Sequence, residues 1–331
     1  MKNYQIAIVG ATGAVGTELL AVLEKRNFPV AGLRPIGSPR SAGKTLTWKG
    51  EKIPVETLSE DSFRGIDIAF FSAGSSISKS HAPLARKAGA IVIDNSPAFR
   101  MEDDVPLVIS EINPEDAKKH SGIIANPNCT AAVALMALYP LHRIFRAKRV
   151  IGASYQAVSG TGARAIEELR RQVHAAVNGT ESPAEVYPHP IAFNLLPHIG
   201  SFGENGYTSE EDKLESEGRK IMHAPEFKAS ITCVRVPVYR AHSVALSAEF
   251  AEPVSLDRAR ETLAKAPGLE LMDEPTANRY PMPLFVAGHD ACQVGRVRID
   301  RAWENGLSFW VAGDQLLKGA ALNAVQIAEL L

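Results

Sequence analysis

The first third of the chain alternates short apolar runs with segments whose apolar positions recur at helical spacing. The runs are rich in β-branched residues, as are strands that are buried on both faces of a sheet. The predicted strands are Tyr4–Val9, Val30–Gly37, Ile66–Ser72, Ala90–Ile93 and Gly122–Ala125, and the predicted helices are Thr17–Arg26 and Ser78–Ala88. Strands and helices in this alternating order predict an α/β domain with a doubly wound parallel sheet.

The pattern changes in the second part of the chain. Lys228–Phe250 contains long runs of alternating apolar and polar positions, which are typical of antiparallel strands. The other predicted elements are the strand Arg149–Val158, the helix Arg164–Ala176, the loop-rich stretch Asn178–Gly206, a helix from a Ser255 cap through Ala264, a hairpin of Val294–Asp300 and Leu307–Ala312 around Asn305-Gly306, and an amphipathic helix at Leu316–Leu331. We expect an α+β domain with a mixed sheet, one face of which packs on a partner subunit.

The composition narrows the class of protein. With 331 residues, 45% apolar and 22% charged, the chain is long enough for two ordinary globular domains. A formal net charge of −1 offers no bulk basic field for nucleic acid or an anionic membrane. Three widely spaced cysteines favour a reducing compartment over a disulfide framework, so we expect a cytoplasmic protein. The first apolar run is too short for a signal peptide, and none approaches the roughly 20 residues of a membrane span.

A glycine-rich turn, Gly10–Gly16, follows the first predicted strand and precedes the first predicted helix. Its GxxGxxG spacing is a variant of the dinucleotide fingerprint, in which glycines allow a tight turn and helix N-terminal amides hold a pyrophosphate. The strand–turn–helix context favours this interpretation over a merely structural turn. The residues expected to contact the cofactor are Gly10, Thr12, Gly13, Ala14 and Val15, together with Ser72, Ala73 and Gly74 at the end of another predicted strand.

The segment after the second predicted strand indicates which cofactor is bound. An NAD-specific site usually carries an acidic residue there for the ribose hydroxyls. Here Ser38, Arg40, Ser41 and Lys44 supply hydroxyls and cations and no acid, which favours the 2′-phosphate of NADP. A solvated basic loop is the alternative, because exposed arginines and lysines are commonplace.

Cys129 stands where a predicted strand ends and an apolar helix begins, in ANPNCTAAVALMALYPL. A thiolate at a helix N-terminus is favoured by the free amides and the dipole, and Asn128 is placed to orient it. Cys129 is therefore a candidate nucleophile, although a free cysteine is often simply a small buried hydrophobe. Cys233 lies within an alternating strand and is interpreted as packing, and Cys292 has no helix start behind it.

A catalytic thiol needs a base, and the stretch RVPVYRAHS offers His242. One histidine among nine is by itself more often a surface or strand residue than a base. Two arginines in the same stretch suggest an anion site, which periodicity alone does not establish.

Several segments occur in an order that matches one known family and cover nearly the whole chain. They are GATGAVG, SPRSAGK, DNSPAFR, ANPNCT, SYQAVSGTG, FNLLPHIG, ENGYTSEE, RVPVYRAHS and DQLLKGAALNAVQIAELL. On these motifs the sequence resembles the aspartate-semialdehyde dehydrogenases. ANPNCT together with RVPVYRAHS is the most specific part of the resemblance.

The resemblance implies a role for each matching residue. The implied catalytic residues are Cys129 as the nucleophile that forms a thioester, His242 as general acid/base and Gln156, which orients the acyl group. The implied substrate-binding residues are Arg235 for the α-carboxylate, Glu210 for the amino group, Arg100 and Lys213 for the phosphate, and Asn128 beside the thiol. Ser159, Gly160 and Gln315 are expected to lie against NADP. No metal is implied.

The implied reaction is the NADPH-dependent reductive dephosphorylation of L-aspartyl 4-phosphate to L-aspartate 4-semialdehyde. It belongs to the biosynthesis of lysine, through diaminopimelate, and of threonine, methionine and isoleucine. A thiolate attacks the acyl phosphate and later leaves the reduced carbon, while a histidine with a pKa near the operating pH moves the protons. The sequence departs from the family pattern at Ala131, Val244 and Gln315, where Thr, Glu and Asn are usual. None of these departures removes a catalytic group.

Other classes of protein are less consistent with the residues. N-acetyl-glutamyl-phosphate reductases usually have Pro-Gly before the cysteine, whereas Asn128 stands here, and glyceraldehyde-3-phosphate dehydrogenases carry an NAD-type acid. A catalytically inactive nucleotide-binding relative would tend to lose the cysteine.

The expected architecture has two domains. A Rossmann-type NADP-binding domain comprises residues 1–127 and 315–331, and residues 128–314 form a catalytic and dimerisation domain. We expect a homodimer or tetramer whose partners are small-molecule substrates, without nucleic acid or membrane.

Overall fold

The computed structural model describes residues 3–331, which form two compact units. One unit runs through Asn128 and takes in Ala320–Leu331, and the other is Cys129–Gly319. The end of the chain therefore returns to the first unit, and the change of unit falls directly before Cys129. Each unit has its own six-stranded sheet.

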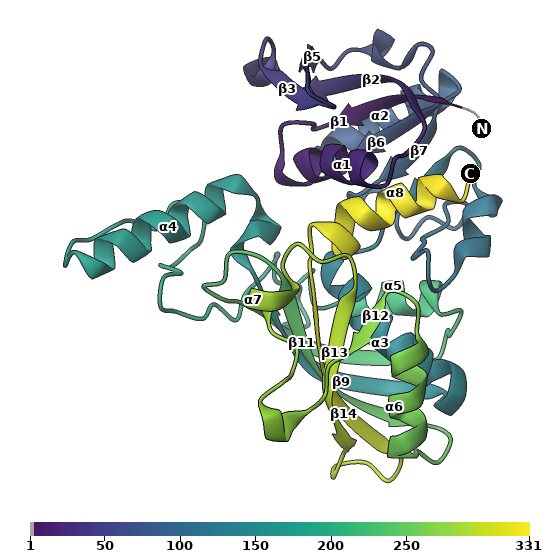
Figure 1. The fold of residues 1–331 in the computed structure, drawn as a ribbon, viewed down its shortest axis with the longest axis vertical. Helices are drawn as coiled ribbons and strands as arrows, with labels where there is room; N and C mark the ends of the chain where they lie inside the picture. Colours follow the sequence, from purple (N-terminus) through teal and green to yellow (C-terminus); the bar gives the residue numbers. More distant parts are fainter. Residues whose placement is uncertain (1–2) are drawn as a thin grey trace. The chain divides into compact units, whose positions relative to one another are not determined.

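The first unit is built on a parallel sheet in the order β5-β2-β1-β6-β7-β8 (Figure 1). Its strands are β1 (Tyr4–Val9), β2 (Val30–Gly37), β5 (Glu56–Thr57), β6 (Ile68–Phe71), β7 (Ile91–Asp94) and β8 (Ile123–Ala125). The central strands are apolar and buried, as both-face burial requires. The predicted doubly wound parallel sheet is confirmed. Its parallel strands carry their carboxyl ends, including Gly10, Ser72 and Asn95, to one edge.

Three α-helices complete this unit. They are α1 (Ala14–Lys25), α2 (Ser75–Lys87) and α8 (Leu322–Glu329). Helix α1 packs against α8, and Arg26 clamps Glu329 with two hydrogen bonds of 2.7 and 2.6 Å. Helix α1 begins three residues earlier than predicted, directly at the glycine turn, because Gly13 is its N-cap. Single 3₁₀ turns occur at Pro39–Ser41, Glu60–Phe63 and Pro114–Lys119.

A short antiparallel hairpin, β3 (Thr45–Trp48) and β4 (Glu51–Pro54), extends from this unit. The sequence analysis did not predict it. In β3 exposed Thr45 and Thr47 alternate with half-buried Leu46 and buried Trp48, but each strand has only four residues, which is too short for the alternation to stand out in the sequence.

The predicted helix over Leu316–Leu331 is present for most of its length, but the prediction that it is amphipathic was wrong. The structure has a π-helical turn, Leu317–Ala321, followed by α8, and most of this segment is buried on all sides. Asn323 is buried because its amide is bonded, donating to Asn126 Oδ1 (2.6 Å) and to Val108 O (2.8 Å). Polar residues that are satisfied inside the protein give the same sequence pattern as residues that face water.

The second unit is built on a mixed sheet in the order β10-β9-β11-β14-β13-β12. Its strands are β9 (Ala147–Gln156), β10 (Lys228–Arg235), β11 (His242–Phe250), β12 (Leu269–Leu271), β13 (Cys292–Ile299) and β14 (Gly306–Gly313). The β9–β10 and β12–β13 pairs are parallel, and the pairs between them are antiparallel. The predicted mixed sheet is confirmed, as is the predicted hairpin: β13 and β14 are antiparallel, and the loop that joins them ends at Asn305, directly before Gly306 begins β14.

Most helices of this unit pack along the sheet, whereas the helix of residues 163–177 extends away from it (Figure 1). Its helices are α3 (Cys129–Phe145), α4 (Ala163–Val177), α5 (Lys213–Ile221), α6 (Leu256–Lys265) and α7 (Pro283–Val286). Helix α3 contacts α5, α6 and the central strands. The predicted Ser255 cap is confirmed, since its hydroxyl accepts from Arg258 N. Within residues 3–331, no helix has both the length and the apolar character needed to cross a membrane.

Candidate active site

The glycine turn of the first unit is shaped by close backbone approach. Gly10 has φ +88°, and a Cβ on it would lie 2.3 Å from the carbonyl oxygen of Ser72. A Cβ on Gly16 would lie 2.3 Å from Gly10 O, so the first turn of α1 sits directly on the loop. The structure therefore brings Gly10–Val15 to the same place as Ser72-Ala73-Gly74, as the sequence predicted for a cofactor cradle.

The N-terminus of α1 provides the chemistry that a pyrophosphate needs. Gly13 caps the helix without a side chain, and the amides of Ala14 and Val15 open the first turn. Thr12 is bonded to Ser41, Oγ to Oγ at 3.1 Å, so the turn and the 38–44 segment are adjacent. Ser38, Arg40 and Lys44 are exposed there. These residues fit a dinucleotide that carries an additional phosphate near the second strand.

Arg100 lies in the same unit and is almost wholly buried. Its Nε donates to Asn126 O at 2.9 Å, and one Nη donates to Asn95 O at 2.9 Å. Asp94 supports the same loop, accepting hydrogen bonds from the hydroxyls of Ser78 and Ser96 at 2.8 Å. Burial raises the pKa of Asp94 above its ordinary value, against the opposing effect of those hydrogen bonds. Arg100 thus holds the strand end that leads into Asn128 and Cys129.

Cys129 is the first residue of α3, as predicted, and its side chain is partly exposed. The following turns of α3 are buried from Thr130 to Leu138, so the helix is rigidly packed behind it. Its position at the positive end of a helix dipole favours the thiolate. Cys233 differs, since burial raises the pKa of its thiol to about 12, and Cys292 is completely buried.

Gly319 lies against the backbone and Cβ of Cys129. A Cβ on Gly319 would meet Cys129 Cβ at 2.7 Å and Cys129 Cα at 3.1 Å. Gly319 belongs to the π-helical turn, and its amide donates to Asp314 O at 3.2 Å. Its φ is not positive, so the close approach is the reason for a glycine here. The sequence analysis missed this residue, because a glycine in a C-terminal helix gives no signal of what it touches.

His242 begins β11 and is completely buried. Ala157 N donates to His242 Nδ1 at 3.1 Å, so the neutral ring carries its hydrogen on Nε2. Nε2 has no hydrogen-bond partner among the described residues, and a Cβ on Gly160 would lie 3.2 Å from it. Burial, assisted by the charge of Arg235, lowers the pKa of His242 to about 3. The histidine is therefore a neutral donor that lies close to Gly160, rather than an ordinary titrating imidazole.

Gln156 and Glu210 form a buried polar pair. Gln156 Nε2 donates to Glu210 Oε1 at 3.2 Å, and its Oε1 accepts from Ser154 Oγ at 2.8 Å. Lys213 forms an ion pair with the other oxygen of Glu210 at 2.7 Å. The structure therefore places the predicted residues Gln156, Glu210 and Lys213 in one cluster. Ser154, which orients the Gln156 amide, was not predicted.

Arg235, at the end of β10, joins this cluster to the histidine. Its Nη1 donates to Ala157 O at 2.7 Å, while Ala157 N is the donor to His242. Arg235 Nε is buried and has no hydrogen-bond partner among the described residues. A guanidinium with buried and unused donor capacity is suited to a carboxylate.

Gln315 connects two predicted site segments. Its amide nitrogen donates to Ser159 Oγ, and its Oε1 accepts from Ala241 N at 2.8 Å. The neighbouring Asp314 is buried and accepts from Arg240 Nε at 2.5 Å and from Gly288 N at 2.6 Å. The segment after β14 therefore braces the loops on either side of His242. Arg240 serves this bracing: of the two arginines whose stretch suggested an anion site, it is the one that pairs with Asp314.

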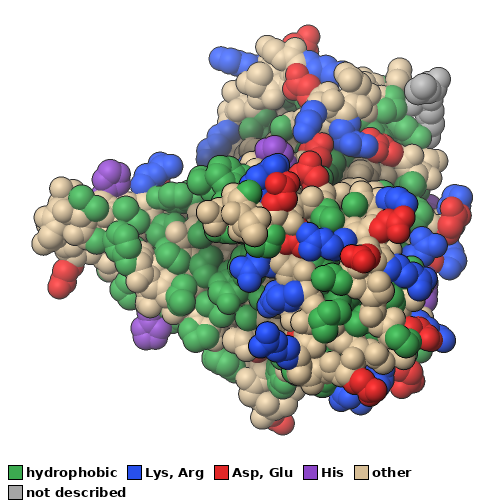
Figure 2. All heavy atoms as spheres, turned by 60° about the horizontal axis from the view of Figure 1, so that its bottom comes forward, with side chains coloured by type: hydrophobic (Ala, Val, Ile, Leu, Met, Phe, Trp, Pro, Cys, Tyr) green, Lys and Arg blue, Asp and Glu red, His purple; other side chains and the backbone are tan. Residues whose placement is uncertain are grey.

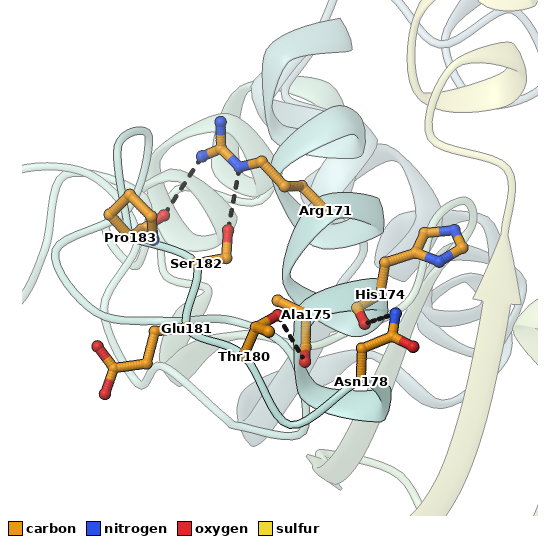
Figure 3. A pocket seen from close by; sticks show the side chains of 8 residues that line it. All are labelled: Arg171, His174, Ala175, Asn178, Thr180, Glu181, Ser182 and Pro183. Atoms are coloured by element: carbon orange, nitrogen blue, oxygen red, sulfur yellow. Dashed lines mark hydrogen bonds between the residues drawn. The ribbon is translucent and has the colours of Figure 1, made fainter.

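A shallow hollow of about 390 Å³ lies beside α4, where Arg171 reaches across to Ser182 and Pro183 (Figure 3). It contains none of the predicted site residues. Among residues 3–331 there is no group of three or more His, Cys, Asp or Glu side chains arranged to hold a metal ion.

Known families match both units. The description "Semialdehyde dehydrogenase, NAD binding domain" matches residues 5–120, and "Semialdehyde dehydrogenase, dimerisation domain" matches residues 138–318. The fold and these matches define the class, which is a nicotinamide-dependent oxidoreductase that acts on an aldehyde. The matched dimerisation domain makes it an oligomer-forming chain.

Individual relatives narrow this class to one family. An aspartate-semialdehyde dehydrogenase of Aquifex aeolicus is 54% identical over 99% of this chain and 98% of its own length. An aspartate-semialdehyde dehydrogenase of Synechocystis is 51% identical over 99% of this chain and 97% of its own length. The solved structure of aspartate semialdehyde dehydrogenase II from Vibrio cholerae, complexed with ASA, superposes with a TM-score of 0.97 at 40% identity, covering 100% of this chain and 98% of that one. The chain belongs to the aspartate-semialdehyde dehydrogenase family.

Proposed function

We propose that this protein reduces L-aspartyl 4-phosphate to L-aspartate 4-semialdehyde with NADPH, through a thioester on Cys129. The observation that carries the mechanism is the position of Cys129 at the start of a buried helix, in the unit that also holds Gln156, Glu210, Arg235 and His242. Full-length similarity to aspartate-semialdehyde dehydrogenases supports this reaction over an inactive relative or an N-acetyl-glutamyl-phosphate reductase. The product serves the biosynthesis of lysine, threonine, methionine and isoleucine.

The binding roles follow from charge and geometry. Arg235 takes the substrate α-carboxylate through its unused guanidinium hydrogens, and Glu210 takes the amino group. Arg100 and Lys213 receive the phosphate, and Asn128 helps to orient the thiol. Lys213 and Glu210 lie 2.7 Å apart, so the groups assigned to the phosphate and to the amino group are neighbours.

The chemical steps use a small number of side chains. The Cys129 thiolate attacks the acyl carbon, and inorganic phosphate leaves with the electron pair of the broken C–O bond. Bound NADPH supplies a hydride to that carbon. His242 donates a hydrogen bond from Nε2 to the oxygen that becomes negative, and proton exchange at this atom accompanies release of the aldehyde from sulfur. Gln156 holds the acyl group during these steps.

The cofactor roles are divided between the units. Residues 1–127 and 315–331 bind NADP, and residues 128–314 supply the catalytic groups. We assign the phosphate cradle to the glycine turn and Ser72-Ala73-Gly74, and the 2′-phosphate to the 38–44 segment. Ser159, Gly160 and Gln315 are assigned to the nicotinamide end, which agrees with the short approach between Gly160 and His242 Nε2.

We further propose a homodimer, with a tetramer as the higher alternative, in the cytoplasm, where the thiol stays reduced. Figure 2 shows hydrophobic side chains gathered on one side of the second unit, around the arm that α4 forms. Exposed large hydrophobic residues of this unit are Ile151, Val177, Phe193, Leu195, Phe202, Tyr207, Tyr239, Leu284, Phe285 and Ile299. Exposed apolar surface of this extent is typical of a subunit interface.

Replacement of the nucleophile tests the mechanism. For Cys129→Ala we expect NADP reduction, assayed with aspartate semialdehyde and phosphate, to fall by at least about 10⁴-fold, because no thioester can form. NADP affinity, measured by fluorescence titration, should stay within about twofold, since no cofactor contact is removed. The matched control is Cys292→Ala, which removes a thiol that is buried elsewhere in the same unit. Substantial turnover by Cys129→Ala would refute the role of the thiol.

A further inference from the structure

The loop that follows α4 is held by a carboxylate buried within the helix. Glu168 is 3% exposed, and its Oε2 accepts from the amides of Glu185 (2.7 Å) and Val186 (2.6 Å). Its Oε1 accepts from Tyr187 N at 3.4 Å. Burying a carboxylate is costly unless amides satisfy it, so this arrangement fixes the backbone that leads into Tyr187, including the Tyr187 amide itself.

A second buried side chain anchors the loop further along. Gln172, one turn beyond Glu168, accepts from Ile191 N (2.8 Å) and Ala192 N (3.1 Å) through its Oε1. The loop then pairs with the end of β10, since Leu196 and Arg235 exchange two backbone hydrogen bonds of 3.0 and 2.8 Å. Tyr187 is therefore carried on a segment fixed at both ends, and one of these ends is the backbone of Arg235 itself.

The Tyr187 side chain reaches the site residues directly. Its ring lies 5.8 Å from the central carbon of the Arg235 guanidinium, within cation–π range. Its hydroxyl donates to Thr161 Oγ1 at 3.0 Å. Burial raises the pKa of Tyr187, which keeps the phenol neutral and able to donate.

The guanidinium is thus restrained in two ways. Ala157 O accepts from Nη1 at 2.7 Å, and the guanidinium lies over the Tyr187 ring. A guanidinium that is planar and held in this way presents its remaining hydrogens in a fixed direction. Such preorganisation increases affinity for a carboxylate, because less side-chain freedom is lost when it binds.

We propose that Tyr187 is a positioning residue that holds Arg235 for the α-carboxylate and so contributes to substrate specificity. This inference rests on the proposed role of Arg235. It assigns to the loop of residues 183–196 a part in selecting amino-acid aldehydes over aldehydes that lack the carboxylate.

The test compares three replacements of one side chain. Tyr187→Leu removes the ring, Tyr187→Phe keeps it without the hydroxyl, and Tyr187→Trp keeps an aromatic face. We expect Tyr187→Leu to raise the KM for aspartate semialdehyde about 10-fold with kcat within about twofold, and Phe and Trp to restore the KM largely. KM for phosphate and for NADP should not change. Thermal unfolding of each variant verifies that it is folded.

The substrate 3-aminopropanal, which lacks the α-carboxylate, separates positioning from general damage. If Tyr187 acts through Arg235, Tyr187→Leu lowers kcat/KM for aspartate semialdehyde but not for 3-aminopropanal. An equal loss for both aldehydes, no loss for either, or a Tyr187→Phe variant as impaired as Tyr187→Leu would overturn the proposal.

Arg235→Lys distinguishes this inference from the function on which it rests. If this variant binds aspartate semialdehyde as tightly as the original protein, the assignment of Arg235 to the carboxylate fails. If Arg235→Lys is impaired while Tyr187→Leu is not, only the role of Tyr187 fails.

Discussion

The glycine turn of the first unit and the cluster of buried polar side chains in the second unit are built in opposite ways. Around Gly10 the structure removes side chains so that backbone can approach backbone, and the recognising groups are amides. In the second unit the buried side chains of Gln156, Glu210, Arg235 and His242 come together from distant segments, and their burial sets their chemistry. A site built from backbone tolerates almost no added atom, whereas a site built from side chains depends on the orientation of each group.

The largest effect on the backbone-built site is expected from Gly10→Ala. A Cβ would lie 2.3 Å from Ser72 O in a backbone with φ +88°, so both overlap and strain oppose it. We expect NADP affinity to fall at least about 100-fold. The control is Gly50→Ala, which has φ +82° but nothing within 4 Å and should leave NADP binding unchanged.

The milder Gly13→Ala keeps this prediction testable if Gly10→Ala does not fold. Its Cβ would lie 3.3 Å from Gly10 O, at a contact that a small shift relieves. Isothermal titration with NADP measures all three variants. Unchanged affinity in both Gly10→Ala and Gly13→Ala would show that the turn does not hold the cofactor.

Gly319→Ala introduces the same kind of steric overlap in the second unit, beside Cys129. Alanine normally stabilises a helix relative to glycine, but here its Cβ would press on Cys129 at 2.7 Å. We expect kcat to fall by about 10- to 100-fold with NADP affinity unchanged, because a small displacement of a nucleophile is costly. The pH dependence of alkylation of Cys129 by iodoacetamide should also shift, since the thiol moves relative to the start of α3.

Gly218→Ala is the matched control for this replacement. Its Cβ would meet the Phe227 ring at 3.0 Å inside the same unit, without touching the thiol. It should cost stability and leave kcat and alkylation unchanged. Equal loss of kcat in both variants would mean that Gly319 acts only through general packing.

The smallest expected effect is on how the free energy of unfolding changes at acid pH. The pKa of His242 is lowered to about 3 in the folded protein, from an ordinary 6.5. The unfolded chain therefore binds a proton below about pH 6.5 that the folded protein does not accept until about pH 3, and stability is lost as the pH falls through this window. At pH 5 this loss is about 2 kcal/mol.

His242→Asn removes the group that binds this proton in the unfolded chain. We expect its free energy of unfolding, measured in urea, to fall less between pH 7 and pH 5 than that of the original protein, by about 2 kcal/mol. Identical pH dependence in the two proteins would mean that the ring is not held neutral by burial.

The two regions also differ in how well their sequences predicted them. The glycine turn was predicted with its flanking strand and helix, because its spacing reflects local geometry. Cys129 was placed correctly at a helix start for the same reason. Tyr187 and Gly319 were missed because each contacts a residue that is distant in sequence, and such contacts leave no local pattern. Ser154 was missed although it is only two residues from Gln156, because a serine in a strand does not show in sequence which side chain it bonds.

The C-terminal segment shows the limit of pattern reading most clearly. The periodicity of Leu316–Leu331 predicted a helix with one wet face, but the segment is a π-helical turn and a helix that are mostly buried. Lys318 and Asn323 are inside, and the Asn323 amide is satisfied by Asn126 and Val108. A polar residue that finds partners inside the protein cannot be distinguished by sequence from one that faces solvent.

The sequence by itself determined the fold class, the parallel and mixed sheets, the glycine turn and the position of Cys129 at a helix start. Each of these depends on residue spacing, glycine freedom or helix geometry within a few turns of chain. Only the tertiary structure decided that His242 is a neutral donor, that Gly319 lies against the thiol, and that Tyr187 backs Arg235. Burial and the meeting of distant segments set these properties, and both exist only once the chain has folded.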